Sequence, residues 1–520
     1  MVWQHEVDEL KRRHEFAENM GGPEGIAAQR KRGKLTIRER IKALVDPGSF
    51  QQMGKLQGSG TYDENGVLKG FMPSSHVAGL CRLNGRRVYV SGEDFTVRGG
   101  TGDGYMTADT ESGRGHPSPM KLRLPTVYLT DTGGGSVAAF EELGRTYIPD
   151  GPFFGPMTSM LSIAPVVTAI VGPAAGGAAP KPCLSHFSVI ARGVGQVFPG
   201  GPPVVKAALG YDIDKEDLGG WQIHTRISGI VNNATDTEEE AFEQVRKFLS
   251  YMPDNVWGMP PRIKTGDDPE RRDESLLSAI PRNKRRRYDP RVVLDGVVDT
   301  DSFFEISPDY GRSLIIGLAR ADGFPVGVML NNINHIGGAL DVTAADKATR
   351  FVQLCDTFHI PMVCLTDAPG ILVGKESEKQ GIERDASRLF MAINESKMPW
   401  ITFILRQAYG VQGAMQYRPN AHLYRRYAWP SGHWGSMHIE GGTSAAFRRV
   451  IESSPDPKAK KEELENRFRA ISSPFRTAEA TGLDIIDPRD TRSLLCDFVE
   501  MSQAIIKTQL GPGSGPTYRP

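Results

Sequence analysis

The sequence has few cysteines, no excess of either charge and no long apolar run, and each absence excludes a class of protein. Its five cysteines are scattered without a CxxC spacing, so neither a zinc ribbon nor a disulfide framework is expected. Sixty-two basic residues balance sixty-two acidic ones, which gives no overall attraction to nucleic acid or anionic membranes. Nowhere do eighteen apolar residues follow one another, and the N-terminus lacks the apolar core of a signal peptide. We therefore expect a cytoplasmic protein without a metal ion, a membrane span or a nucleic-acid partner.

The chain repeats itself with a period of nearly half its length. Residues 79–90 align with residues 317–328, and six of these positions are identical. Two further matches follow in the same order along the chain, and they pair residues 125–131 with 361–367 and residues 165–172 with 399–406. Generic strand composition could explain any one match but not three in order, so the sequence predicts an internal duplication.

Each half is predicted to hold the same α/β unit. Short β-branched runs that begin at proline and end at glycine or aspartate are typical of buried strands. Segments such as 346–358 and 381–396 carry apolar residues at helical spacing. Alternation of strands and helices predicts parallel strands joined by helical crossovers. Composition rich in Pro, Asp and Arg predicts a linker at 266–290, between an N-terminal domain at 1–265 and a C-terminal domain at 291–520.

Glycines follow the predicted strands at equivalent places in both halves. The first glycine loop spans residues 172–179, and the second glycine loop spans residues 406–415. A backbone N–H without a neighbouring side chain can approach a ligand oxygen closely and stabilise an oxyanion. For one such loop alone, a structural role as a tight turn is favoured over a catalytic role. Because both halves carry the loop at equivalent strand ends, two oxyanion sites become the favoured interpretation. Glycines also follow the strands that end at Asp131 and Asp367, where binding and structural roles are equally favoured.

Ordered motifs extend over nearly the whole chain, at residues 38–50, 92–97, 200–206, 216–220, 224–229, 345–351, 367–370, 427–430 and 482–492. Together they resemble the carboxyltransferase (beta) subunit family of biotin-dependent acyl-CoA carboxylases. This family has two tandem crotonase-like (ClpP/crotonase) α/β domains, so the resemblance implies that fold.

The resemblance implies transfer of a carboxyl group from carboxybiotin to the carbon of an acyl-CoA enolate. The acyl-CoA would bind mainly to the N-terminal domain and biotin to the C-terminal domain, although the two loops could exchange these roles. The implied catalytic amides are those of Gly176, Gly177, Gly410, Val411 and Gln412. The implied substrate-binding residues are Gly133, Gly134, Gly135, Ala175, Ala178, Gly370, Tyr409 and Gly413.

Two segments depart from the propionyl-CoA type of the family. Residues 132–136 read Thr-Gly-Gly-Gly-Ser, where that type usually has Ser-Gly-Gly-Ala-Arg. The pair Val411-Gln412 is nearer to the Tyr-Gly-Met-Cys-Gly pattern of methylcrotonyl-CoA types. The sequence therefore leaves the acyl group open.

The chain has neither a biotinylation turn of the Ala/Val-Met-Lys-Met kind nor an ATP-binding GxxxxGK[ST] motif. Biotin would therefore be carried on a separate chain, and a biotin carboxylase or biotin carrier subunit is the expected partner. The family also implies a homo-oligomer, a hexamer built as a trimer of dimers. An acyl-CoA decarboxylase of the same fold, a hydratase and a non-catalytic paralogue remain as alternatives.

Overall fold

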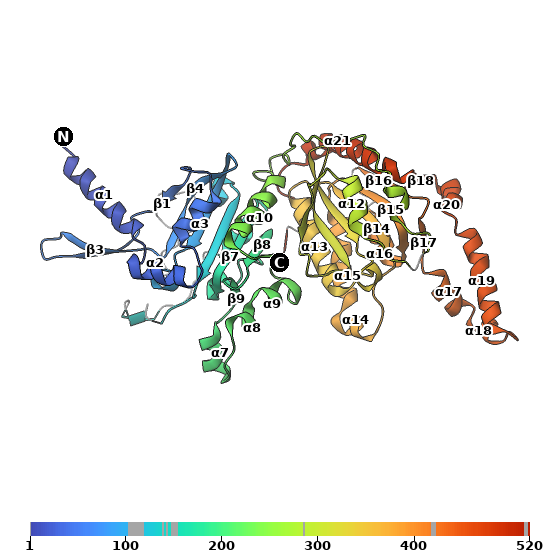
Figure 1. The fold of residues 1–520 in the computed structure, drawn as a ribbon, viewed down its shortest axis with the longest axis horizontal. Helices are drawn as coiled ribbons and strands as arrows, with labels where there is room; N and C mark the ends of the chain where they lie inside the picture. Colours follow the sequence, from blue (N-terminus) through green and yellow to red (C-terminus); the bar gives the residue numbers. More distant parts are fainter. Residues whose placement is uncertain are drawn as a thin grey trace. The chain divides into compact units, whose positions relative to one another are not determined.

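The computed structural model describes residues 2–101, 119–137, 140–141, 144–146, 154–283, 286–417, 423–513 and 518–519. The chain forms two compact units, of which the first comprises Met1–Val256 with Arg519–Pro520 and the second comprises Trp257–Tyr518 (Figure 1). Residues 266–290, for which a linker was expected, lie in the second unit, where Leu276 is buried in the core.

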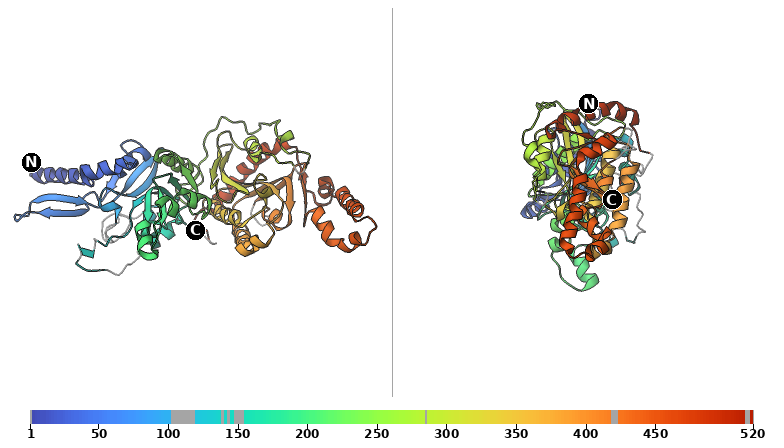
Figure 2. Two further views of the ribbon diagram at one scale, coloured as in Figure 1. Left: turned by 60° about the horizontal axis from the view of Figure 1, so that its bottom comes forward. Right: turned by 90° about the vertical axis from the view of Figure 1, so that its right-hand side faces the viewer.

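Within the described ranges, a sheet of eight strands forms the centre of the first unit. β4 and β5 pair as an antiparallel hairpin, and the strands from β5 to β8 run parallel. The strand order is β1 (Gln51–Met53), β4 (His76–Leu83), β5 (Arg86–Glu93), β6 (Thr126–Thr132), β7 (Val166–Ala175), β8 (Phe187–Ala191) and β10 (Asn233–Thr235), with β9 (Gln196–Phe198) beside β7. A separate hairpin consists of β2 (Gly58–Tyr62) and β3 (Leu68–Pro73), and α1 lies along it (Figure 2).

The described part of the second unit repeats this sheet strand for strand. Its order is β11 (Phe304–Ile306), β12 (Leu314–Ala321), β13 (Phe324–Asn331), β14 (Met362–Ala368), β15 (Trp400–Tyr409), β16 (Tyr424–Ala428) and β18 (Asp484–Ile485), with β17 (His433–Gly435) beside β15. The registers agree as well, because Gly79 pairs with Val90 in the first unit and Gly317 pairs with Val328 in the second. The predicted α/β duplication is confirmed.

The turn chemistry explains the two equivalent hairpins. Asn84 and Gly85 join β4 to β5 with φ of 51° and 79°, and Asp322 and Gly323 join β12 to β13 with φ of 48° and 76°. Two-residue loops with positive φ at both positions match the twist of the flanking strands, and they favour Asn or Asp followed by Gly.

Capping boxes start two helices of the first unit. Thr36 with Glu39 begins α3, and Thr237 with Glu240 begins α10, which lies against β7 and β8. The described helices are α1 (Gln4–Glu18), α2 (Gly22–Lys31), α3 (Ile37–Leu44), α4 (Pro119–Leu122), α6 (Phe154–Met160), α7 (Pro202–Leu209), α8 (Lys215–Gly219), α9 (Trp221–Arg226) and α10 (Glu238–Tyr251), with the short 3-10 turns η1 (Arg98–Gly100) and η2 (Gly176–Ala178).

Helices cover both faces of the second sheet. Val326 and Val328 of β13 share a core with α12 and α21, while Gly327 between them faces Cys355 of α13. The predicted helices at 346–358 and 381–396 correspond to α13 and α15. The described helices are α11 (Leu276–Ala279), α12 (Pro290–Val297), α13 (Val342–Thr357), α14 (Lys375–Gln380), α15 (Ile382–Glu395), α16 (Gly410–Met415), α17 (Ile439–Ala446), α18 (Arg448–Glu452), α19 (Pro457–Ile471), α20 (Pro474–Thr481) and α21 (Thr491–Gln509), with the 3-10 turns η3 (Ile336–Gly338) and η4 (Pro488–Asp490).

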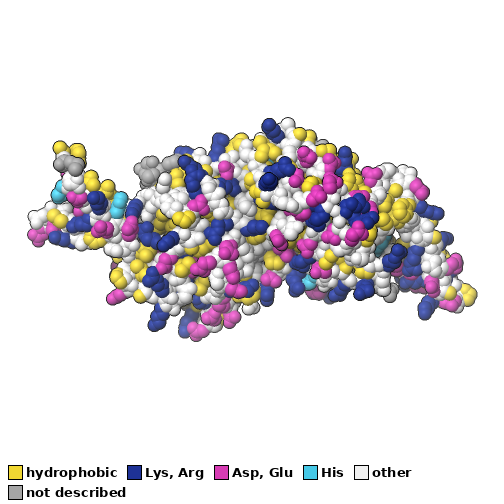
Figure 3. Space-filling model, turned by 45° about the horizontal axis from the view of Figure 1, so that its top comes forward, with side chains coloured by type: hydrophobic (Ala, Val, Ile, Leu, Met, Phe, Trp, Pro, Cys, Tyr) yellow, Lys and Arg dark blue, Asp and Glu magenta, His cyan; other side chains and the backbone are white. Residues whose placement is uncertain are grey.

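Basic and acidic side chains are interspersed over the face shown in Figure 3. None of the helices in the described ranges combines the length and apolar character that a bilayer crossing requires. In the same ranges, no three His, Cys, Asp or Glu side chains gather in a way that could hold a metal ion.

Candidate functional site

In the first unit, the predicted loops meet at the carboxyl ends of β6 and β7. Gly133 donates its N–H to the carbonyl of Gly99 in η1 at 2.9 Å. A Cβ on Gly134 would lie 3.2 Å from the carbonyl of Ala175, so these loops contact each other backbone to backbone. This close approach, together with a φ of 87°, favours glycine at position 134.

The two predicted amides of the first glycine loop have different surroundings. Gly176, with a φ of 59°, donates its N–H to the carbonyl of Pro199 at 3.2 Å. A ligand oxygen at this loop would therefore have to compete with Pro199 or accept from Gly177. Ala175 and Ala178 are buried on either side of the pair.

In the second unit, the second glycine loop comprises the end of β15 and the helix α16 that follows it directly. Tyr409 is the N-cap, and Gly410 has a φ of 56°. The first N–H groups of a helix have no acceptor within it, so Gly410, Val411 and Gln412 offer the three predicted donors. The Val411 side chain is 55% exposed, whereas that of Gln412 is buried. Gly413 cannot carry a side chain, because its Cβ would lie 2.5 Å from the carbonyl carbon of Ala408.

Two histidines surround the buried ring of Tyr409. The Tyr409 hydroxyl hydrogen-bonds to Nδ1 of His433 at 3.0 Å, and the ring of His438 lies 3.9 Å from the Tyr409 ring. Nε2 of His438 in turn donates to the carbonyl of Pro369, beside Gly370, at 2.9 Å. Burial raises the pKa of Tyr409 to about 12, so its hydroxyl stays neutral at physiological pH and serves as a structural contact.

A buried ion cluster lies at the base of the loop after β6. The carboxylate of Asp131 accepts from Lys34 at 2.6 Å, from Arg40 at 2.7 Å and from Gln29 at 2.8 Å. Arg40 also bonds to Glu238 at 2.6 Å, which brings two cations and two anions together out of solvent. Burial raises the pKa of Glu238 and lowers that of Lys34. The cluster connects α3 and α10 to the strand end that carries Gly133–Gly135.

The second unit has an equivalent buried aspartate with a different cation. Asp367 lies 2.9 Å from Nε of Arg406 and accepts from the hydroxyl of Tyr288 at 2.9 Å. Thr130 pairs with Ile170 in the first sheet as Thr366 pairs with Ile404 in the second, so Arg406 corresponds to Gly172. A Cβ on Gly172 would lie 2.0 Å from Oδ1 of Asp131. The neutralising arginine therefore comes from α3 in one unit and from the adjacent strand in the other.

Sequence reasoning missed these ion clusters, although Arg40 carries a recognisable signal. The positions Ile37, Arg40, Ile41 and Leu44 lie on one face of α3, and all four are buried. A charged residue at a core-facing position of an amphipathic helix needs a buried partner. The sequence contains no indication that the partners are Asp131 and Glu238.

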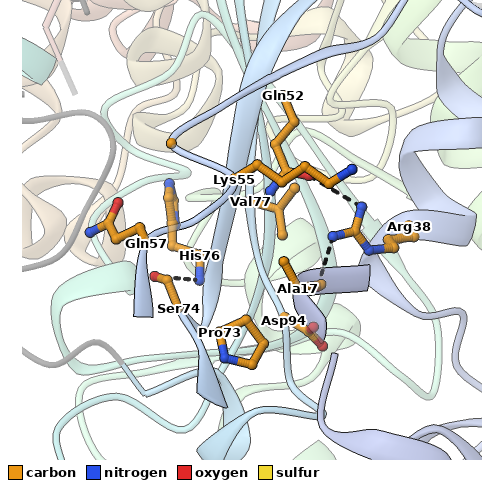
Figure 4. Close-up of a pocket in the computed structure, with 11 residues that line it drawn as sticks. Ala17, Arg38, Gln52, Lys55, Gln57, Pro73, Ser74, His76, Val77 and Asp94 are labelled. Atoms are coloured by element: carbon orange, nitrogen blue, oxygen red, sulfur yellow. Dashed lines mark hydrogen bonds between the residues drawn. The ribbon is translucent and has the colours of Figure 1, made fainter. Parts of the chain in front are cut away.

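A small polar pocket in the first unit contains none of the predicted site residues (Figure 4). Its walls include Arg38, which donates to Oε1 of Gln52 at 3.2 Å and to the carbonyl of Ala17 at 3.0 Å. With a volume of about 10 Å³ it has room for a single water molecule, so an acyl-CoA would not fit there.

Comparison with known proteins identifies the family to which the chain belongs. Residues 28–508 match the family described as carboxyl transferase domain. The propionyl-CoA carboxylase carboxyltransferase subunit of Haloferax mediterranei is 34% identical over 514 residues, which cover 98% of each chain. The methylmalonyl-CoA decarboxylase subunit alpha of Veillonella parvula is 32% identical over 92% of each chain.

The solved structures agree in fold. The transcarboxylase 12S structure, described as a hexamer with methylmalonyl-coenzyme A and methylmalonic acid bound, superposes with a TM-score of 0.86 at 29% identity. The match covers 99% of this chain and 98% of that one. Because sequence and structure agree over nearly the full length, the chain belongs to the carboxyl transferase family.

Proposed function

We propose that the chain is the carboxyltransferase subunit of a biotin-dependent acyl-CoA carboxylase. The observation that carries the proposal is the pair of glycine loops at equivalent strand ends of a duplicated sheet. Carboxyl transfer to the carbon of a thioester enolate places negative charge on two oxygens in turn, one on each substrate. A protein with one amide-lined loop in each unit can stabilise both oxyanions.

The loops have distinct proposed roles. In the first unit, Gly177 and, by competition with Pro199, Gly176 would donate to the thioester oxygen. In the second unit, the first turn of α16 offers N–H groups without helical acceptors, which fits the negative charge that develops on the ureido oxygen of biotin during transfer. Biotin, when bound, supplies the carboxyl group. One well-placed donor is typically worth about 10² to 10³ in kcat.

We assign the substrate contacts to the neighbouring loops. Gly133, Gly134 and Gly135 with Ala175 and Ala178 would border the acyl group, because Gly134 and Gly135 lie next to Gly176 and the two alanines flank the pair Gly176-Gly177. Gly370, Tyr409 and Gly413 would shape the biotin side, because hydrogen bonds and close packing connect them to α16.

The chain would need partners for the complete carboxylation. We infer a separate biotin carrier and biotin carboxylase, because the sequence has neither the biotinylation turn nor an ATP-binding motif. The transcarboxylase 12S structure is described as a hexamer, and we propose the same assembly here. None of the five cysteines forms a disulfide, which suits the reducing cytoplasm.

The test runs the transfer in reverse on the purified chain. Malonyl-, methylmalonyl- and 3-methylglutaconyl-CoA are incubated with and without free biotin, and mass spectrometry follows the loss of CO2. We expect decarboxylation only with biotin, and the preferred thioester identifies the acyl class. Decarboxylation without biotin would replace the proposal with a biotin-independent decarboxylase. No decarboxylation of any thioester, even with a biotinylated carrier present, would refute it.

A further inference from the structure

The side chain of Gln412 turns away from solvent and bridges two loops. Its Oε1 accepts from the N–H of Gly370 at 2.8 Å, and its Nε2 donates to the carbonyl of Gly338 at 3.0 Å. The side chain is 2% exposed, so both bonds form out of water. Gln412 thus joins the turn η3, the loop after β14 and the first turn of α16.

The first unit joins the same loops without any side chain. There Gly133 N–H donates directly to the carbonyl of Gly99. By the strand registers, the second unit has Pro369 at the position of Gly133 and Gly337 at the position of Gly99. Proline has no N–H, so this direct bond cannot form in the second unit.

The second unit also has open space where a side chain on Gly370 would lie. A Cβ on Gly134 would touch the backbone of Ala175, whereas a Cβ on the equivalent Gly370 would meet nothing within 4 Å. Ala178, which corresponds to Gln412, has a side chain too short to bridge such a gap. The long amide of Gln412 reaches across this space and donates to the carbonyl of Gly338, the residue after Gly337.

Besides the bond to Gln412, the loop after β14 makes few described hydrogen bonds to its neighbours. His438 donates to the carbonyl of Pro369, and Leu340 exchanges backbone bonds with Gly370 and Leu372. These contacts hold the loop to η3 and to α17, but they do not reach the first turn of α16. Only the Gln412 side chain, among the described hydrogen bonds, joins that turn to both neighbouring loops.

We propose that Gln412 is a positioning residue for the second glycine loop. The Gln412 side chain fixes the first turn of α16 and thereby directs the backbone amides of that turn at a ureido oxygen. The inference relies on the proposed function for the identity of the ligand. The geometric part, that the side chain fixes the turn and the loop after β14, is independent of it.

The experiment compares three variants in the decarboxylation assay, with free biotin as the varied ligand. Gln412→Met keeps the buried volume and removes both hydrogen bonds. We expect it to lower kcat/KM for biotin roughly 10- to 100-fold, which is the combined effect of losing two ordinary hydrogen bonds. The KM for the acyl-CoA should stay unchanged. Gln416→Met is the matched control, because Gln416 is equally buried nearby and its Oε1 has no partner among the described atoms.

Gln412→Glu adds a pH signature that a merely space-filling role would not produce. A buried carboxyl has a raised pKa, and once protonated it can donate to the carbonyl of Gly338 and still accept from Gly370. The deficit of Gln412→Glu relative to the wild type should therefore shrink as the pH falls. The deficit of Gln412→Met should not change with pH.

Hydrogen exchange at Gly370 tests the positioning without any turnover. Its amide should exchange about tenfold faster or more in Gln412→Met than in the wild type and in Gln416→Met. Unchanged exchange, or equal losses for biotin and acyl-CoA with a lowered melting temperature, would overturn the inference. If the wild type shows no biotin-dependent decarboxylation, the proposed function fails, and exchange at Gly370 alone decides whether Gln412 fixes the loop.

Discussion

Replacing Arg40 by methionine removes the central cation of the ion cluster in the first unit. Arg40 is fully buried and donates to Asp131, to Glu238 and to the carbonyl of Val171 at distances of 2.6 to 3.2 Å. Methionine occupies a similar length and lacks donors, so the variant leaves two carboxylates and one carbonyl without this partner. Lys34 remains as the single cation beside Asp131.

The expected loss is large because the remaining charges cannot reach water. Removing one partner of a buried ion pair typically costs about 3–5 kcal/mol. For a unit of this size, each kcal/mol lowers the melting temperature by about 2–4 °C, so the transition should fall by roughly 6 to 20 °C. The loss should diminish as the pH falls, because burial already raises the pKa of Glu238 and protonation removes its uncompensated charge.

Calorimetry measures the melting temperature of the variant. Hydrogen exchange in β6 and α10 shows whether the loss of stability lies in the first unit. The control is Arg30→Met, because Arg30 lies 2.6 Å from Glu39, as Arg40 does from Glu238, but its side chain is 63% exposed. An exposed pair contributes at most about 1 kcal/mol. Equal shifts for the two variants would refute the argument that burial, and not contact distance, sets the energy.

Three further predictions follow from the same structure. Gly172→Ala should lower the free energy of unfolding by about 3–5 kcal/mol, because its Cβ would displace the buried carboxylate of Asp131. In the control Gly133→Ala, the new Cβ has no neighbour nearer than 3.7 Å, so calorimetry should find a nearly unchanged melting temperature. The buried amine of Lys347 donates to two backbone carbonyls, and burial lowers its pKa to about 7. The folded state therefore binds fewer protons than the unfolded state between about pH 7 and 10. Stability should rise with pH there, and urea unfolding of Lys347→Met should lack that slope. Tyr409→Phe should keep the wild-type pH–rate profile from pH 6 to 10, because the hydroxyl of Tyr409 ionises only near pH 12; an ionisation in that range that the variant lacks would contradict its structural role.

Local patterns accounted for the parts of the fold that depend on neighbours in sequence. Alternating strands and helices predicted the parallel crossovers. Sequence reasoning missed the two antiparallel hairpins, although the Asn84-Gly85 and Asp322-Gly323 turns that fix their registers are local signals. The glycine loops were found because a strand end followed by glycines is a local signal. Their roles in binding remain predictions.

Features that depend on tertiary contacts could not be predicted in the same way. Asp131 and Arg40 are separated by 91 residues, and no periodicity connects them. The direction of the Gln412 side chain depends on the width of a gap between three loops. Composition likewise does not show the contacts of residues 266–290, where Arg271 donates to the carbonyl of Val298 at 3.1 Å and Arg272 lies 3.2 Å from Asp487, which attach this polar segment to the second unit.

The two ways of neutralising the strand-end aspartate constrain how the halves can evolve. A single change of Gly172 to arginine would crowd Asp131 while Arg40 is still present, and a single loss of Arg406 would leave Asp367 without its arginine. Each half is thus confined to its own arrangement, because any route from one to the other passes through an intermediate with a surplus or a missing buried charge. The two copies of the sheet have thus become non-interchangeable at this position, although their strand registers agree.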